Sequence, residues 1–250
     1  VWRVNSDGEL RDVFGKTTHI FEMEEIDFFR HYADGKAQND AFLEECKIAY
    51  ERVFGKIPEL PFSNLWCAKQ ISKKLPENCV LHLGILNSLR SWNFFDIPDS
   101  VTAFANTGGF GIDGDVSSLV GASLADKNKL YFGIFGDLAF FYDMNVLGNH
   151  HVGNNVRIML INNGRGTEFR NYNHPAQAFN DDADAYMAAA GHYGNKSPVL
   201  VKHYAEDLGY EYLCASNKDE FLKASERFLT AEMTAKPMLF EVFTDSKEES

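Results

Sequence analysis

The fold is decided by residues 131–169, YFGIFGDLAFFYDMNVLGNHHVGNNVRIMLINNGRGTEF. An apolar run over residues 131–135 stops at Gly136-Asp137, and a helical pattern of apolar residues follows it. A second apolar run over residues 156–161 ends at Asn162-Asn163-Gly164. Two buried strands with polar tips, joined by a helix, predict a βαβ unit.

The polar tips of these two strands are expected to lie side by side. Asp137 and Asn163 are 26 residues apart (163−137=26), which suits one strand–helix–strand crossover, and ligands of α/β sheets bind at neighbouring carboxyl ends. A carboxylate, an amide oxygen and a loop carbonyl are suitable ligands for Mg²⁺. The sequence therefore predicts a metal–diphosphate site. The simpler alternatives are a helix N-cap for Asp137 and an Asn-Gly turn for Asn163.

Composition and charge narrow the class of protein. The 250 residues are 45% apolar and 24% charged, as in an ordinary globular protein. The formal charge of −12 argues against binding to nucleic acid or to an anionic membrane. No apolar run approaches the ~20 residues that span a bilayer, and the four cysteines show no CxxC spacing. We expect a cytoplasmic protein with reduced, mostly buried thiols. Because the chain does not begin with Met, we expect it to be part of a longer protein.

The remaining sequence divides near Pro58–Pro61. We expect residues 1–60 to be the tail of a preceding domain, with little core and a linker helix capped by Asn39 or Asp40. From residue 61 to 250 we expect one domain in which strands and helices alternate. That alternation predicts an α/β three-layer sandwich, a mostly parallel sheet with helices on both faces. Further strands are expected at 79–83, 101–104, 210–214 and 238–243, and helices at 63–75, 115–125, 181–190, 198–208 and 217–230, before a frayed acidic tail at 245–250.

Four motifs in this order resemble a known family. Gly136-Asp137, followed after about 25 residues by Asn162-Asn163-Gly164, is similar to the thiamine-diphosphate motif. Upstream stand Leu86-Asn87-Ser88-Leu89 and Asn106-Thr107-Gly-Gly-Phe-Gly111-Ile112-Asp113-Gly114, and residues 141–145 read FYDMN. Over about residues 62–243 these motifs resemble the C-terminal, diphosphate-binding domain of 2-succinyl-5-enolpyruvyl-6-hydroxy-3-cyclohexene-1-carboxylate synthase, a carboligase of menaquinone biosynthesis. The resemblance implies the thiamine-diphosphate-binding fold.

The resemblance also implies roles for individual residues. Asp137, the Asn163 side chain and the backbone carbonyl of Arg165 would bind Mg²⁺, and Ile112 would be the apolar wedge that bends the cofactor. The implied cofactor-binding set is Ser88, Asn106, Gly109, Gly111, Ile112, Gly136, Asp137, Leu138, Asn163 and Arg165. Two alternatives stay open, because Ile112 also suits a plain core position and Ser88 a helix cap.

The implied activity is decarboxylation of a 2-oxo acid followed by carboligation. In that family a glutamate that activates the cofactor comes from a pyrimidine-binding domain of the same or a partner chain. Because residues 1–250 contain no equivalent of that domain, no catalytic residue is predicted here and the fragment alone is expected to be inactive. The expected partners are that domain, a 2-oxo acid and a second copy in a homodimer or homotetramer, with no nucleic acid or membrane.

The chain departs from the family at the positions expected to hold substrate. Thr107 stands where the family has an arginine, Arg90 lies two positions before the place of a second arginine, and Arg165 and Glu168 replace small or neutral residues. Because pairing of arginine with carboxylate is geometrically demanding, these changes predict an acceptor other than isochorismate. Arg90, Thr107 and Glu168 are the candidate substrate residues.

Two other functions remain open at this point. One is a subunit of a split decarboxylase of the sulfopyruvate or phosphonopyruvate type, and the other is a degenerate, non-catalytic binding module. Phe140, Phe141 and Met144 are assigned to the core or to an interface. His150-His151 is expected to lie in a solvated loop rather than to share a metal.

Overall fold

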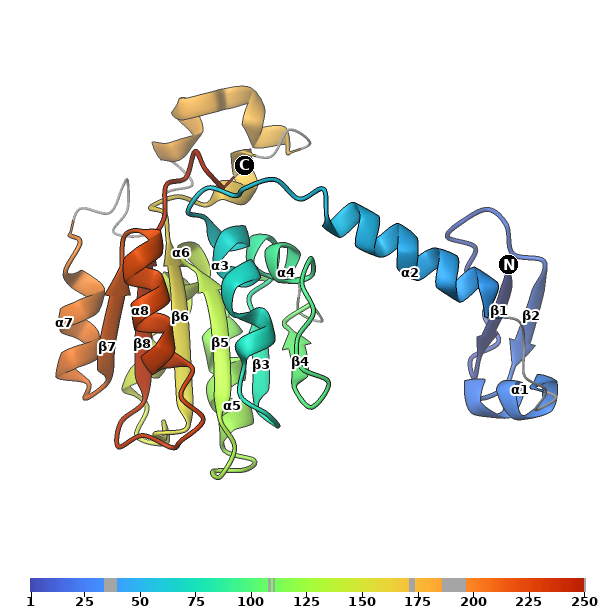
Figure 1. Ribbon diagram of the computed structural model, residues 1–250, viewed down its shortest axis with the longest axis horizontal. Helices are drawn as coiled ribbons and strands as arrows, with labels where there is room; N and C mark the ends of the chain where they lie inside the picture. Colours follow the sequence, from blue (N-terminus) through green and yellow to red (C-terminus); the bar gives the residue numbers. More distant parts are fainter. Residues whose placement is uncertain (34–39, 108, 110, 171–173, 186–196, 250) are drawn as a thin grey trace. The chain divides into compact units, whose positions relative to one another are not determined.

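The computed structural model describes residues 1–33, 40–107, 109, 111–170, 174–185 and 197–249. The chain forms two compact units, Val1–Pro58 and Glu59–Ser250. The larger unit is an α/β domain built on one six-stranded sheet, which Figure 1 shows with helices in front of it and behind it.

The six strands of this sheet are all parallel, in the order β4-β3-β5-β6-β8-β7. Their bounds are β3 Val80–Leu83, β4 Thr102–Ala105, β5 Tyr131–Gly136, β6 Val156–Asn162, β7 Glu211–Ala215 and β8 Met238–Phe243. All seven residues of β6 are buried, as are the first five of β5. These strands read as continuous apolar runs because helices cover both of their faces.

The helices form two layers, so the predicted three-layer sandwich is confirmed (Figure 1). The helices are α3 Asn64–Ile71, α4 Asn87–Trp92, α5 Asp115–Ser123, α6 Asp137–Asp143, α7 Leu200–Asp207 and α8 Lys218–Phe228. On the face covered by α8, Phe228 contacts Phe132 and Phe240 with ring centroids 5.4 and 5.5 Å apart. On the opposite face Phe140 of α6 is fully buried among residues of α5 and α7. Phe140 therefore belongs to the core, and Phe141 and Met144 pack against it.

Short polar side chains begin two of these helices, as the sequence predicts. Ser63 Oγ accepts a hydrogen bond from the backbone N–H of Trp66 (3.3 Å), and Asn217 Oδ1 accepts one from Glu220 (3.0 Å). Asp40 differs, because it precedes α2 (Ala41–Phe54) without making a capping hydrogen bond. Asn39, the alternative cap, lies outside the described residues.

The described residues include the 3₁₀-helices η1 Ser72–Lys74, η2 Met144–Gly148, η3 Thr167–Arg170 and η4 Pro175–Ala185.

Two segments, the helix predicted at 181–190 and the acidic tail at 245–250, differ from the prediction. Residues 181–185 belong to η4, which kinks at Asn180 (φ 47°), so an α-helix beginning at 181 is wrong; residues 186–190 lie outside the described part. The acidic tail is not frayed over 245–249, because Thr244 N–H donates to Asn162 O (3.2 Å) and the carboxylate of Glu249 binds the start of α3.

The smaller unit contains β1 Trp2–Asn5 and β2 His19–Glu22, which pair in parallel, and helices α1 Glu25–Tyr32 and α2. Ring centroids of Trp2, Phe21, Phe28 and Tyr32 lie 4.6 to 6.3 Å apart. No described residue of 1–58 is buried. As expected, this unit has little core of its own.

The cysteines are free thiols, with Cys67 and Cys79 buried and Cys46 and Cys214 exposed. The prediction that most of the cysteines are buried is therefore wrong, because two of the four are exposed. Among the described helices, none is both long enough and apolar enough to cross a bilayer.

Candidate functional site

The site begins where β5 and β6 end together. In the pairing of these strands Gly136 lies opposite Ile161, so Asp137 and Asn163 leave the sheet at the same edge. A cavity of about 280 Å³ opens there, and both residues line it. The spatial prediction drawn from their spacing therefore agrees with the structure.

Asp137 is the first residue of α6 and is only 2% exposed. Gly136 takes the N-cap position and Asp137 makes no capping bond, so the cap alternative is wrong. Its Oδ1 accepts from Leu138 N–H (2.7 Å), whereas its buried Oδ2 has no hydrogen-bond partner. Burial raises the pKa of this carboxyl to about 7, and the nearby backbone N–H groups of residues 163–165 act in the opposite direction. A buried carboxylate oxygen without a partner, in the lining of a cavity that Asn163 and Glu168 also line, is one that a cation would satisfy.

Asn163 begins the loop that faces Asp137. Its Oδ1 accepts from the backbone N–H of Arg165 (3.0 Å), and Gly164 between them adopts φ 77°. That conformation is open to glycine at little cost, so the turn alternative for Asn163 is correct. A turn does not exclude a ligand role, because an amide oxygen has a second lone pair.

Helix α4 supplies another part of the cavity lining through Asn87 and Ser88. Ser88 is 2% exposed and accepts from Asn64 Nδ2 at 3.3 Å. It lies inside α4, whose N-cap is Leu86, so the cap alternative for Ser88 is wrong. Leu86 also lines the cavity and has φ 66°. A branched residue in this conformation carries strain of the kind that clusters at functional sites.

The structure brings most of the predicted site residues to this cavity. Its lining includes Ser88, Gly111, Ile112, Gly136, Asp137, Leu138, Asn163, Arg165 and Glu168. Asn106, Gly109, Thr107 and Arg90 are not part of the lining. Ile112 is half-buried on the cavity wall rather than in the core.

The two charged candidates for substrate binding pair with each other. Arg90 Nη1 forms an ion pair with Glu168 Oε2, and the Arg90 side chain is 53% exposed. Asn87, with its amide oriented to satisfy its neighbours, donates to Glu168 Oε2 and accepts from Glu168 N–H, both at 3.1 Å. These contacts join α4 to η3 at the rim of the cavity. Thr107 donates its N–H to Ala105 O and stays outside the cavity.

Glu249 is a cavity residue that the sequence did not reveal. Both of its carboxylate oxygens lie 3.1 Å from the backbone nitrogen of Asn64, and Thr244 Oγ1 donates to Oε1 at 2.5 Å. Burial raises the pKa of this carboxyl. No local pattern marks Glu249, because its place depends on how residues 244–249 fold back.

A second missed feature is a buried network behind the tip of β6. Glu241, in the middle of β8, accepts from Asn162 Nδ2 (2.7 Å) and from the hydroxyl of Tyr212 (2.6 Å). Glu241 is 1% and Asn162 2% exposed. An available signal was the lone acid inside the apolar strand MLFEVF.

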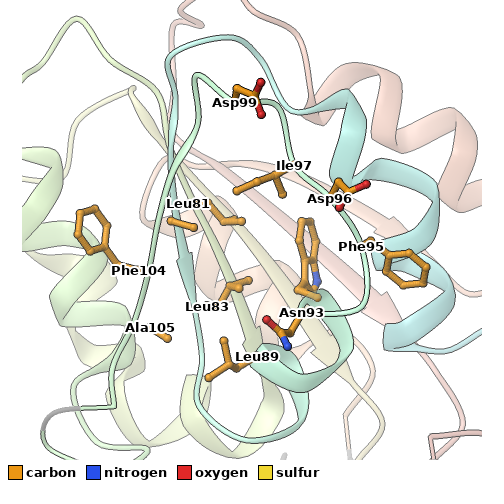
Figure 2. Close-up of a pocket in the computed structure, with 12 residues that line it drawn as sticks. Leu81, Leu83, Leu89, Asn93, Phe95, Asp96, Ile97, Asp99, Phe104 and Ala105 are labelled. Carbon is orange, nitrogen blue, oxygen red and sulfur yellow. The ribbon is translucent and has the colours of Figure 1, made fainter. Parts of the chain in front are cut away.

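A larger hollow of about 600 Å³ lies beside the edge strand β4, away from these residues. Figure 2 shows apolar side chains of β3, β4, α4 and the loop after it around the hollow, together with the polar residues Asn93, Asp96 and Asp99. None of the predicted site residues lines it. The polar residues of the larger hollow belong to one segment, 93–99, whereas the smaller cavity gathers polar side chains from α4 and from the ends of two adjacent parallel strands. Since ligands of α/β sheets bind at such strand ends, we assign the site to the smaller cavity.

The other candidates form no site. His150 and His151 are exposed, as expected of a solvated loop. In the described part of the chain, no three His, Cys, Asp or Glu side chains gather as a metal cluster would require. Asp143, from the FYDMN motif, does not line the cavity and accepts from Ser117 N–H (2.5 Å) and Oγ (2.6 Å) at the start of α5.

Asp115, at the start of α5, is a buried acid outside the cavity. It is 2% exposed, and neither carboxylate oxygen accepts a hydrogen bond of normal geometry from a described residue. Burial raises its pKa to about 6, with Asp143 and Asp113 adding to the rise and the Asn106 side chain and the Ile85 backbone opposing it. The protonated carboxyl is therefore the form that the fold favours.

Stability should accordingly fall as the pH rises from about 4 to about 6. In that window the folded carboxyl of Asp115 keeps a proton that the unfolded chain has released. Above about pH 6 both states are ionised, and the full decrease in the free energy of unfolding has been reached. Asp115→Asn should remove this component and raise the free energy of unfolding by about 2 kcal/mol above pH 6. Urea unfolding of both proteins between pH 4 and 8 measures the difference. Parallel stability curves over the whole range would contradict it.

Over its whole length the chain is similar in sequence to the same enzyme from several bacteria. It is 33% identical over 254 residues to the 2-succinyl-5-enolpyruvyl-6-hydroxy-3-cyclohexene-1-carboxylate synthase of Phocaeicola vulgatus, a match that covers 100% of this chain and 43% of that protein. The synthases of Bacteroides fragilis and Flavobacterium psychrophilum are 32% and 30% identical over 256 and 253 residues, again with 43% of each covered. No protein-family model matches the chain. The chain, which spans less than half the length of these relatives, is therefore related to the 2-succinyl-5-enolpyruvyl-6-hydroxy-3-cyclohexene-1-carboxylate synthases, and the resemblance to this family that its motifs predicted is confirmed.

Proposed function

We propose that this chain is the domain that binds the diphosphate of thiamine diphosphate through Mg²⁺ in a thiamine-diphosphate-dependent 2-oxo acid decarboxylase and carboligase. The observation that carries the proposal is that Asp137 and residues of the Asn163–Arg165 loop line one cavity at the carboxyl ends of two adjacent parallel strands. The similarity to synthases of that name supports the same function.

The residues present fit a magnesium ion with its diphosphate. Asp137 offers a buried oxygen without a partner, and Asn163 offers an amide oxygen. The backbone carbonyl of Arg165 would be the third protein ligand. Mg²⁺ prefers an octahedral shell of oxygen ligands that phosphate and water complete. Because the chain has a net charge of −12, a divalent ion would also offset the repulsion between the protein and an anionic cofactor.

The chain's own residues would bind and orient rather than react. When bound, thiamine diphosphate supplies the carbanion chemistry that breaks the bond between the carboxyl and carbonyl carbons of a 2-oxo acid. Asp137 and Asn163 would hold the diphosphate end, while Ile112 would support the cofactor from the cavity wall. Arg90 and Glu168 stand at the rim, where their ion pair would meet the substrate. Asn106 and Gly109 would have to move to reach the cofactor, because neither lines the cavity.

The activity would require parts that this chain does not supply. We expect the glutamate that activates the cofactor to come from a pyrimidine-binding domain, in a homodimer or homotetramer. The chain spans 43% of the relatives' length, which leaves room for such a domain in the full-length protein. Alone, this chain should therefore bind the cofactor weakly and turn over no 2-oxo acid.

Titration calorimetry of the full-length protein with thiamine diphosphate tests the proposal. We expect binding in the presence of Mg²⁺ and a loss of affinity of about 100-fold when EDTA removes the metal. Equal cofactor affinity with Mg²⁺ and with EDTA, or no cofactor binding at all, would refute the proposal. Carbon dioxide release from a panel of 2-oxo acids then separates an enzyme from a module that only binds.

Glu249 offers a further prediction about this cavity. Its carboxylate lines the same cavity as Asp137 and would repel a diphosphate. Glu249→Ala in the full-length protein should therefore tighten Mg²⁺–thiamine diphosphate binding by about fivefold. Glu226 of α8 is exposed and lines neither this cavity nor the hollow beside Asn163 and Arg165, so Glu226→Ala is the matched control and should change affinity less than twofold. If both substitutions tighten cofactor binding equally, the effect comes from the net charge of the protein and not from the position of Glu249 in the cavity.

A further inference from the structure

Glu241 is an acid in a place where an apolar residue would be expected. It lies opposite Leu160 of β6 and Cys214 of β7, and it is 1% exposed. Among the described residues no cation forms an ion pair with it; its oxygens are bound by the Asn162 amide and the Tyr212 hydroxyl. A buried carboxylate costs free energy that two hydrogen bonds only partly offset. Core stability alone therefore does not explain Glu241.

The place of the network suggests what it does. Asn162 is the last residue of β6 and directly precedes Asn163. Its side chain is held by Glu241, and its backbone carbonyl accepts from Thr244 N–H at 3.2 Å. The end of β6 is thus bound to β8 through both its side chain and its backbone. The loop of residues 163–165 projects from this point, and its N–H groups face Asp137.

We propose that Glu241 is a positioning residue, which through Asn162 holds the 163–165 loop in the geometry that Mg²⁺ requires. This inference rests on the proposed function, because it concerns the same metal. Tyr212 extends the network to the edge strand β7 and fixes the second oxygen of Glu241. The network contacts Asn162, the residue before the proposed ligand Asn163, and would touch neither the metal nor the substrate.

The choice of metal can distinguish positioning from a purely structural role. Mg²⁺ demands near-ideal octahedral geometry at about 2.0–2.1 Å, whereas Ca²⁺ accepts 6–8 ligands at longer and more variable distances. A loosened loop should therefore weaken Mg²⁺ binding more than Ca²⁺ binding. A general loss of stability would not change the ratio of the two affinities.

Arg157 provides the matched control on the same strand. It lies near the opposite end of β6, is 0% exposed, and donates to the backbone carbonyls of Phe228 (2.8 Å), Thr230 and Glu232 (2.7 Å). Arg157→Met thus removes buried polar contacts of comparable importance. Asn162 is 5 residues further along β6 (162−157=5), or about 16 Å away in an extended strand.

The experiment measures thiamine diphosphate affinity of the full-length protein by calorimetry, with Mg²⁺ and with Ca²⁺, together with thermal stability. Glu241→Leu should lower the affinity about tenfold with Mg²⁺ and less than threefold with Ca²⁺. Glu241→Gln, which keeps the shape and can still bind both partners, should restore most of the Mg²⁺ affinity. Arg157→Met should lower the melting temperature and leave both affinities within about twofold.

Other results would overturn the inference. An Mg²⁺ to Ca²⁺ affinity ratio that Glu241→Leu leaves unchanged, or that Arg157→Met changes equally, makes Glu241 merely structural. Should Glu241→Leu not fold, Tyr212→Phe removes one hydrogen bond from the half-buried end of the network. It should shift the ratio in the same direction by about threefold, and an unchanged ratio would again refute the inference. Failure of the unmodified protein to bind thiamine diphosphate with Mg²⁺ is a different result, which refutes the proposed function itself.

Discussion

Asp137→Ala in the full-length protein should abolish Mg²⁺-dependent binding of thiamine diphosphate, with a loss of affinity of at least about 100-fold. The substitution removes the only carboxylate among the three proposed metal ligands. Asn163 and the Arg165 carbonyl are neutral, so they would not replace its charge. Calorimetry with Mg²⁺ held in excess measures the loss, and it should be accompanied by loss of any 2-oxo acid decarboxylation.

Two further variants distinguish this result from misfolding. Asp137→Asn keeps the shape of the side chain, and it should bind the metal poorly while the protein without cofactor melts no lower than the unmodified one. The reason is that Oδ2 of Asp137 is buried without a hydrogen-bond partner, so the charge does not stabilise the fold. Arg157→Met, a change at another buried charged residue outside the cavity, should leave cofactor affinity within about twofold. Full cofactor binding by Asp137→Ala would refute the metal site.

The parts of the fold that could be predicted are those with local causes. β5 and β6 were found because strands buried on both faces must be apolar throughout. β8 begins at Met238 and ends at Phe243, as predicted. Ser63 and Asn217 marked helix starts because their side chains bind backbone N–H groups only three residues away. Such features depend on neighbours in sequence, so a single sequence contains them.

The parts that could not be predicted depend on distant contacts. Glu249 reaches Asn64 across 185 residues, and Glu241 binds Asn162 across 79. The acidic tail looked frayed because nothing near it in sequence shows a partner. Arg90 and Glu168 were both assigned to substrate, and their mutual ion pair spans 78 residues. Of the cofactor set, Asn106 and Gly109 lie outside the cavity, because the resemblance identifies positions in a motif and not the conformation of the loop.

A strand glycine should be the most sensitive position of the core. Gly133 lies in the middle of β5, where an added Cβ would lie 2.4 Å from Phe135 Cε2 and 2.5 Å from Leu119 Cδ2. Both neighbours are almost fully buried, at 1% and 0% exposed, so neither ring nor methyl can move aside without displacing others. Gly133→Ala should therefore destabilise the domain by about 3 kcal/mol, although alanine favours a strand conformation no less than glycine does.

Thermal denaturation of this chain measures that effect, and another glycine supplies the control. A loss of about 3 kcal/mol corresponds to a fall of about 8 °C in melting temperature for a domain of this size. Gly121 is exposed within α5, and an added Cβ there would meet nothing within 4 Å. Gly121→Ala should therefore raise stability by about 0.5–1 kcal/mol through helix propensity. The same chemical change should thus have opposite signs at two positions of one domain. Equal melting temperatures for the two variants would show that the contacts around Gly133 relax, and that α5 is not packed tightly against β5.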